Sequence, residues 1–147
     1  MTKTAEIEKT SRELAVIAAQ AADEKKASDI MVQEVAELIG VTDYFVIATA
    51  GNDRQVEAIV DAIEEDLRVK GGAKPLHRED ADRKWQLLDY GNIIVHVFQP
   101  EAREYYRLEA LWNDAPVMDL AAEAGLTDIP YSDRIAKLLE EAKVSLS

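Results

Sequence analysis

The most constraining feature of the chain is a change of period inside the segment TDYFVIATAGNDRQVEAIVDAIEEDLRVKGG, residues 42–72. From Tyr44 to Ile47 the residues form an unbroken β-branched and aromatic run, which is typical of a strand covered on both faces. Beyond this run the apolar residues recur at helical spacing instead. They are Val56, Ile59, Val60, Ile63 and Leu67. A doubly covered strand followed at once by an amphipathic helix predicts a layered fold of helices and a sheet.

The predicted helix has its own start and stop signals. Asn52, with Gln55 three residues later, resembles a capping box, and Gly71 and Gly72 supply the end. The strand, small loop and helix start around Gly51 have the layout of a phosphate-binding turn. The lysine-containing and multi-glycine patterns of such turns are missing, so we interpret the segment as a capped turn.

Other segments extend this pattern on both sides. Residues 4–23 predict an amphipathic helix, and residues 28–35 predict a half-buried strand. Residues 73–84 predict a polar loop, which leads into a hairpin over residues 84–98. The chain is therefore expected to alternate helix, strand, strand, helix, strand, strand.

Two further helices are expected after the hairpin. Pro100 suits a first helical position, and Tyr105, Leu108 and Trp112 give the helix that follows an apolar stripe. A last amphipathic helix lies within residues 131–147. The fold class is thus predicted as α/β (α+β), with a mixed β-sheet, flanking helices and an appended C-terminal helix.

The composition limits the function. The chain has 147 residues, which fit one domain, and no cysteine, which excludes a disulfide framework and a thiolate metal site. Its formal net charge of -12 argues against binding nucleic acid through the phosphates and favours a basic protein as partner. Acidity that serves solubility alone is the commoner explanation of such a charge. Because no secretory signal or membrane-spanning run is seen, we expect a cytoplasmic protein without a membrane partner.

The hairpin of residues 84–98 has two unlike faces. A two-residue loop pairs strand positions whose numbers sum to an odd value, which assigns alternate residues to each face. One face receives Trp85, Leu87, Asp89, Ile94, His96 and Phe98, and the other receives Gln86, Leu88, Tyr90, Ile93, Val95 and Val97. The second set suits packing against helices. The first set fits the centre of a binding surface or a core with two satisfied polar groups, and the residues alone favour neither.

The chain offers little support for catalysis. His77 and His96 lack the spacing typical of zinc ligands, so a zinc site is not expected. Asp89 and His96 can face each other across the hairpin, but no motif places a serine or threonine that they would activate. We therefore expect a hydrogen-bonded histidine, and no catalytic residue, metal or cofactor.

Four segments together resemble one known family. TDYFVIATA, DRQVEAIVDAIEE, WQLLDYGNIIVHVF and REYYRLEALW occur in the order typical of the ribosomal silencing factor family, also called RsfS or Iojap. The resemblance covers about residues 10–116. It implies a mixed α/β domain similar in fold to nucleotidyltransferases but without their activity, and usually a homodimer.

The resemblance also implies a function. Such factors bind the large-subunit ribosomal protein L-fourteen where the subunits join, which blocks subunit association and lowers translation under nutrient limitation or in stationary phase. Carried over by motif, the partner-binding residues are Trp85, Leu87, Asp89, Tyr90, His96 and Glu101. Trp85 is then the anchor, while Asp89 and Glu101 meet arginine or lysine on the partner. Strand alternation disagrees for Tyr90, because it assigns this residue to the aliphatic face.

Domain limits and competing functions stay open at this point. The resemblance implies a ribosomal silencing factor domain over residues 1–116 and says nothing of residues 117–147, whose amphipathic helix we expect to pack on the body. A metal-dependent nucleotidyltransferase is the enzymatic alternative, but its glycine-serine turn and following Asp-x-Asp pair are missing. An interaction module for another basic protein would share the surface but not the partner.

Overall fold

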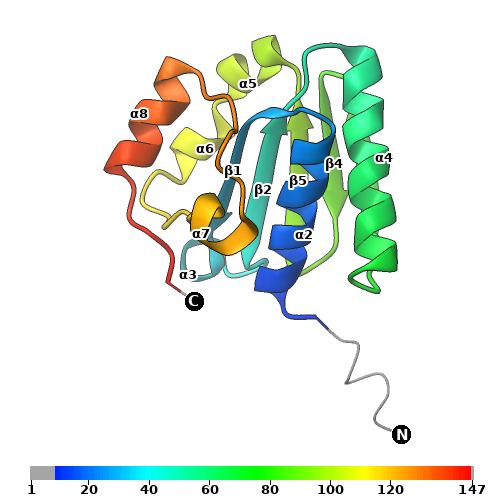
Figure 1. Ribbon diagram of the computed structural model, residues 1–147, viewed down its shortest axis with the longest axis horizontal. Helices are drawn as coiled ribbons and strands as arrows, with labels where there is room; N and C mark the ends of the chain where they lie inside the picture. Colours follow the sequence, from blue (N-terminus) through cyan, green and yellow to red (C-terminus); the bar gives the residue numbers. More distant parts are fainter. Residues whose placement is uncertain (1–8, 147) are drawn as a thin grey trace, which may run out of the picture.

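A five-stranded mixed sheet with the order β1-β2-β5-β4-β3 forms the centre of the molecule (Figure 1). The computed structural model describes residues 9–146. β2 and β5 are parallel, and the other neighbouring strands are antiparallel. The strands are β1 (Ser28–Glu34), β2 (Tyr44–Thr49), β3 (His77–Ala81), β4 (Trp85–Asp89) and β5 (Ile93–Phe98). The predicted mixed sheet with flanking helices is confirmed.

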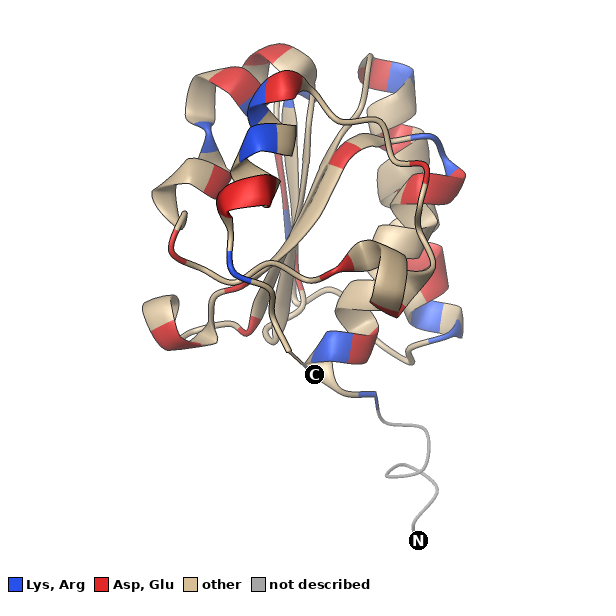
Figure 2. Ribbon diagram, turned by 60° about the vertical axis from the view of Figure 1, so that its left-hand side comes forward, with Lys and Arg blue, Asp and Glu red and all other residues tan. Residues whose placement is uncertain are grey.

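Helices cover both faces of the sheet and divide the core into two layers. They are α2 (Ser11–Glu24), α3 (Ala36–Ile39), α4 (Asp53–Val69), α5 (Pro100–Tyr106), α6 (Leu108–Leu111), α7 (Leu120–Ala124) and α8 (Asp133–Glu141). α2, α4 and α7 pack on the face that carries Val46 and Val95. α5, α6 and α8 pack on the face that carries Ile47 and Phe98. The central strands are nearly free of charged residues, which lie mainly on helices and loops (Figure 2), as a doubly covered sheet requires.

α4 forms as predicted, with its whole apolar stripe buried. The side chain of Asn52 accepts a hydrogen bond from the backbone N–H of Gln55 (2.9 Å). The predicted capping box is only half formed, because the Gln55 side chain accepts from the N–H of Gly51 instead of Asn52. The same side chain donates to the carbonyl oxygens of Lys25 and Lys26. Gln55 thus joins the start of α4 to the end of α2.

α2 begins with a complete capping box. The Thr10 hydroxyl accepts from the N–H of Glu13 (3.1 Å), and the Glu13 carboxylate accepts from the N–H of Thr10 (2.9 Å). This cap starts the helix at Ser11 within the described part of the chain. Residues 4–8 of the predicted helix lie outside the described residues.

The prediction of a loop over residues 73–84 is wrong in its second half, where His77–Ala81 form edge strand β3. All five strand residues are exposed, so no alternating apolar pattern marks them as a strand. The strand forms because β4 offers an open edge. A three-residue turn joins the two strands, with positive φ at Asp82 (58°) and Arg83 (60°). Charged side chains on such an edge oppose pairing with other chains.

The helix predicted from Pro100 to Trp112 is interrupted at Arg107, whose φ of 47° is left-handed. The break separates α5 from α6 and changes which residues face the sheet. Tyr105, expected in the apolar stripe, is 80% exposed, whereas Leu108 and Trp112 pack on the second core layer. The stripe fails at Tyr105 because helical periodicity holds only within a continuous helix.

Residues 117–146 fold back onto the free edge of β1. Val117 forms backbone bridges with Gln33 on one side and with Val144 on the other. Ile135 of α8 is fully buried in the second core layer. The extension therefore packs on its own body as expected, while the predicted domain boundary before it stays a prediction.

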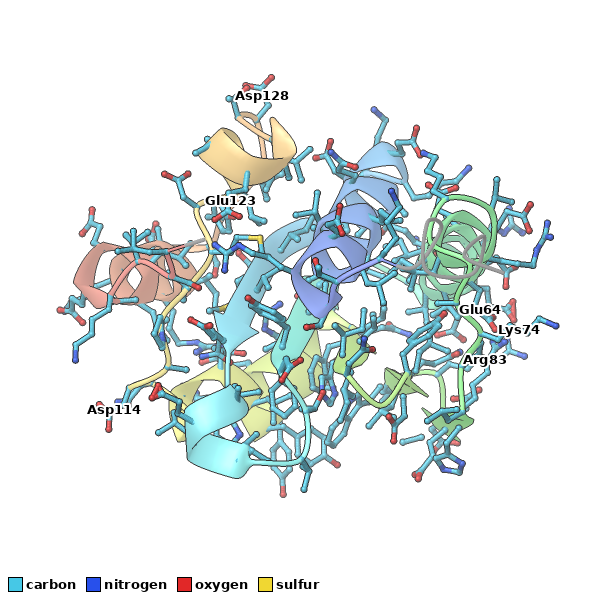
Figure 3. All side chains as sticks on the ribbon, turned by 90° about the horizontal axis from the view of Figure 1, so that it is seen from below. Glu64, Lys74, Arg83, Asp114, Glu123 and Asp128 are labelled. Carbon is cyan, nitrogen blue, oxygen red and sulfur yellow. The ribbon has the colours of Figure 1, made fainter. Side chains whose placement is uncertain are left out.

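Arg12 ties α2 to the C-terminal segment. Its guanidinium forms an ion pair with Glu123 of α7, which points toward α2 (Figure 3). It also donates to the Tyr44 hydroxyl (2.9 Å), the Ser145 hydroxyl (3.0 Å) and the Ser145 carbonyl oxygen (2.9 Å). The hydrogen bond to Glu123 raises the pKa of Arg12 above its ordinary value. One charged side chain thus joins four segments of the chain.

Candidate functional site

The hairpin has the two-faced register that alternation predicts. The pairs on one face are Trp85 with Phe98, Leu87 with His96, and Asp89 with Ile94. Gly91 and Asn92 form the loop, and the N–H of Tyr90 donates to the carbonyl of Ile93 (2.9 Å). Gly91 has a φ of 86°, which suits glycine at the first central position of a tight hairpin.

The helices leave part of this face open over β4. Trp85, Leu87 and Asp89 alternate as half-buried residues with the buried ones of the opposite face. Glu101, at the start of α5, is exposed and lines the same cleft as Trp85. We call these four residues the Trp85 face. The neighbouring strand β5 is more deeply covered, because α5 and α6 pack over it.

Trp85 is held in one orientation by its neighbours. Its indole Nε1–H donates a hydrogen bond to Nδ1 of His96 (3.1 Å). The indole stacks on Phe98, with ring centroids 4.9 Å apart and planes at 27°, and its centroid lies 4.8 Å from that of Tyr106. Aromatic pairs of this kind contribute about 0.5–1.5 kcal/mol beyond their buried area. Trp85 is therefore fixed although it is only half-buried.

His96 is a buried, neutral hydrogen-bond acceptor. It is 4% exposed, and its ring lies edge-on to Phe45 with centroids 4.9 Å apart. Burial, with a smaller contribution from the charge of Arg103, lowers the pKa of His96 from 6.5 to about 3. Because Nδ1 accepts from Trp85, the ring hydrogen lies on Nε2, which has no hydrogen-bond partner within residues 9–146. Such a ring is too weak a base for general base catalysis near neutral pH.

Asp89 and His96 do not face each other. The register places Asp89 opposite Ile94, while Leu87 lies opposite His96. The facing arrangement considered from the sequence is therefore wrong, because a loop of Gly91 and Asn92 pairs Asp89 with Ile94. The Asp89 carboxylate accepts a hydrogen bond from the N–H of Gly91 (2.7 Å), which stabilises the turn.

Tyr90 lies on the aliphatic face, as strand alternation predicts. It is 7% exposed and packs in the core layer under α4. Burial, with a smaller contribution from Glu64, raises the pKa of Tyr90 above its ordinary value. Tyr90 and His96 are thus the two carried-over residues that the structure buries, and neither side chain is open to direct contact. Trp85, Leu87, Asp89 and Glu101 remain accessible.

Three exposed apolar residues on α5 and α6 were missed by sequence reasoning, and two of them, Tyr105 and Tyr106, line a cleft with Trp85. Tyr105, Tyr106 and Leu111 are 80%, 48% and 69% exposed, respectively. The rings of Tyr105 and Tyr106 are in edge contact, with centroids 4.9 Å apart. The two adjacent tyrosines were a sequence signal for an exposed aromatic pair. A continuous helix from Pro100 to Trp112, however, places Tyr105 on the side that faces the core.

No ready metal centre is found within the described residues. In residues 9–146 no group of three or more His, Cys, Asp or Glu side chains is placed to hold a metal ion. Asp53, the acid nearest the turn after β2, instead accepts a hydrogen bond from the Gln99 side chain. The carboxylate cluster that a nucleotidyltransferase needs is therefore not assembled in this part of the chain. Within the same residues, no helix is both long and apolar enough to span a membrane.

Comparison with known proteins identifies the family. The family model described as ribosomal silencing factor during starvation, RsfS, matches residues 8–142. The chain belongs to the ribosomal silencing factor family. The match extends beyond the segments that carried the resemblance and includes α7 and α8.

Individual relatives agree in sequence and in fold. The ribosomal silencing factor RsfS of Bacillus subtilis is 42% identical over 105 residues, which cover 71% of this chain and 88% of the relative. A crystal structure of a Chromobacterium violaceum protein is similar with a TM-score of 0.67 at 30% identity, covering 71% of this chain and 87% of that chain. A Bacillus halodurans crystal structure has a TM-score of 0.60 at 31% identity, covering 69% and 94%, respectively.

Proposed function

We propose that the chain is a translation inhibitor that acts by steric exclusion and not as an enzyme. It binds ribosomal protein L-fourteen on the large subunit and blocks association with the small subunit under nutrient limitation. The proposal includes a cytoplasmic homodimer. The observation that carries it is the Trp85 face in a member of the RsfS family, where a fixed, half-open indole lies beside accessible carboxylates.

The composition of the Trp85 face supports protein binding. Tryptophan is enriched among the residues that dominate binding energy, and a pre-oriented side chain loses less conformational entropy on docking. Leu87 adds apolar area beside it. No ion pair within residues 9–146 involves Asp89 or Glu101, so both carboxylates are available to a basic partner.

Two of the predicted partner-binding residues, Tyr90 and His96, are buried and contribute indirectly. His96 accepts the hydrogen bond that orients Trp85, so its contribution to binding is indirect. Tyr90 packs in the opposite core layer and stabilises the hairpin. No observation favours the nucleotidyltransferase alternative, whose carboxylate cluster is missing from the described residues.

Sedimentation of mixed ribosomal subunits tests the proposal. Added wild-type protein is expected to lower the amount of joined ribosomes and to move with the large subunit. Trp85→Ala is expected to weaken large-subunit binding by about 2 kcal/mol or more, which is roughly thirtyfold. Val69→Ala is the matched control, because Val69 is an exposed apolar residue at the end of α4.

A second substitution separates binding from folding. Glu101→Lys reverses an exposed charge on the Trp85 face, and Glu140→Lys makes the same change at an exposed position of α8. We expect the first to weaken binding and the second to have little effect. An unchanged amount of joined ribosomes with saturating wild-type protein would overturn steric exclusion. Capture of a different basic protein would favour the general interaction module.

A further inference from the structure

A cleft adjoins the Trp85 face between α5 and the turn that joins β3 to β4. Its volume is about 470 Å³, and it is lined by Ala81, Asp82, Lys84, Trp85, Glu101, Ala102, Tyr105 and Tyr106. The turn is anchored in place, because the Gln99 N–H donates to the Lys84 carbonyl (2.9 Å) and the Gln99 side chain donates to the Arg83 carbonyl (3.1 Å). The cleft is therefore built from anchored segments.

Aromatic rings form one side of this cleft. The Trp85 and Tyr106 centroids are 4.8 Å apart with planes at 48°, and Tyr105 stands nearly perpendicular to Tyr106. Phe98 supports the back of the indole. The three lining rings thus present differently tilted π-surfaces, and a cation is attracted to such surfaces by the ring quadrupole.

Carboxylates form the other part of the cleft wall. Asp82 and Glu101 are both exposed, and neither joins an ion pair within the described range 9–146. Lys84 also lines the cleft, but it is exposed on a long flexible stem and can leave the cleft for solvent. The aromatic rings and the two acids together favour a positive occupant.

We infer that this cleft binds an arginine side chain of the basic partner. A guanidinium stacks flat on an aromatic ring while its fork of N–H donors reaches a carboxylate, a combination that the compact ammonium of lysine does not offer. Tyr106 supplies the stacking surface and Glu101 the carboxylate. The inference rests on the proposed function only for the source of the arginine, a segment of the ribosomal protein.

Direct titration tests the cleft without the ribosome. The full-length chain carrying Trp112→Phe leaves Trp85 as its only tryptophan, so Trp85 fluorescence reports on the cleft. N-acetyl-arginine amide is expected to give a saturable change at least tenfold tighter than the neutral citrulline derivative. Tyr106→Leu removes this change and Tyr106→Phe keeps it, because only the ring is required. Near-ultraviolet circular dichroism verifies the fold of each variant.

The Lys84→Met variant tests whether a positive charge in the cleft wall opposes binding of the arginine derivative. Removing this ammonium is expected to tighten binding of the arginine derivative by about two- to threefold, since like charges repel. Equal responses to arginine and citrulline, tighter binding of the lysine derivative, or weaker arginine binding in Lys84→Met would each overturn the inference. Large-subunit binding by wild type is scored separately, so a failure of the proposed function is distinguishable from a failure of the cleft.

Discussion

The role of each hairpin residue depends on whether other segments of the chain bury its side chain. Asp89 and His96 lie on one face, yet Asp89 is half-buried at the turn and His96 is buried beneath helices. Burial lowers the pKa of His96 and leaves the ring as a fixed acceptor for Trp85. A polar residue that looks like a contact residue in the sequence is thus a positioning residue in the structure.

The pH dependence of stability is expected to report on His96. Its folded pKa of about 3 lies below the ordinary 6.5, so between these values the unfolded chain binds a proton that the folded chain does not. The contribution of His96 to the free energy of unfolding is therefore fully present above pH 6.5 and is lost as the pH falls toward 3. We expect a loss of about 2 kcal/mol between pH 7.5 and pH 5. Guanidinium unfolding followed by tryptophan fluorescence measures it.

His96→Gln is expected to remove this part of the pH dependence, because glutamine can still accept from Trp85 but does not titrate. His77→Gln is the matched control, since the His77 side chain is exposed on β3 and contacts the Glu79 carboxylate. Parallel pH profiles for wild type and His96→Gln would contradict the assignment.

At the scale of elements, a buried ion pair sets the geometry of the second layer. Arg103 of α5 and Glu109 of α6 are 3% and 0% exposed, with Nε and Oε1 2.9 Å apart. Arg134 of α8 meets the same carboxylate at 2.7 Å. Arg103 also donates to the Asp29 carbonyl oxygen (2.8 Å) and the Thr49 hydroxyl (2.9 Å). These bonds join three helices to the sheet across the break at the end of α5.

Glu109→Ala is expected to destabilise the fold by about 3–5 kcal/mol, because it leaves Arg103 buried without its counter-charge. Denaturant unfolding measures the change. The double variant Arg103→Met with Glu109→Leu is expected to recover much of the loss, since both members of the buried pair are removed together. Glu65→Gln, which breaks an exposed pair with Arg68, should cost less than about 1 kcal/mol. If Glu109→Ala lowers the free energy of unfolding by no more than Glu65→Gln does, this account is contradicted.

The end of α2 carries a side chain where glycine is favoured. Lys26 follows the helix with a φ of 65°, and its N–H donates to the carbonyl of Asp23 (2.9 Å). The next N–H, from Ala27, donates to the carbonyl of Ala22 (3.1 Å), which completes a Schellman motif. Lys26→Gly is expected to raise stability by about 0.5–1 kcal/mol, because left-handed backbone is strained for other residues.

The measurement for this prediction is the denaturation midpoint at constant slope. Lys25→Gly is the matched control, since Lys25 is also exposed but has a φ of -95°. Equal effects of the two glycine substitutions would show that left-handed strain is not the cause.

For the whole molecule, the C-terminal segment completes one edge of the sheet. β1 is an edge strand, and backbone bridges from Val117 continue its ladder. The N–H of Met118 donates to the carbonyl of Val32 (2.9 Å). The opposite edge, β3, has no such cover within the described residues, and only its charged side chains protect it.

Truncation after residue 116 is expected to lower the free energy of unfolding by at least about 3 kcal/mol, because Ile135 and its neighbours leave the core. The uncovered edge of β1 should also promote self-association. Denaturant unfolding and sedimentation velocity measure the two effects. Truncation after Ser145 is the control, since it removes Leu146, which is 85% exposed. A truncated chain that is equally stable and has the same association state as the untruncated chain would instead support an independent domain over residues 1–116.

The sequence by itself determined the elements whose signals are local. Period, capping residues and alternation depend on neighbours along the chain, and they predicted α4, the hairpin, both of its faces and the position of Tyr90. The family resemblance predicted a partner surface of six residues, of which four are accessible and two, Tyr90 and His96, are buried. Only the tertiary structure decided which side chains are covered.

Coverage depends on residues that are distant in sequence. β3 exists because β4 offers an edge, and His96 is neutral because helices that follow it pack over its face. The break at Arg107 places Tyr105 and Tyr106 beside Trp85, since the buried contacts of Arg103 and Glu109 orient the two short helices. Local pattern cannot encode these outcomes, because burial and pairing are properties of contacts between separate segments.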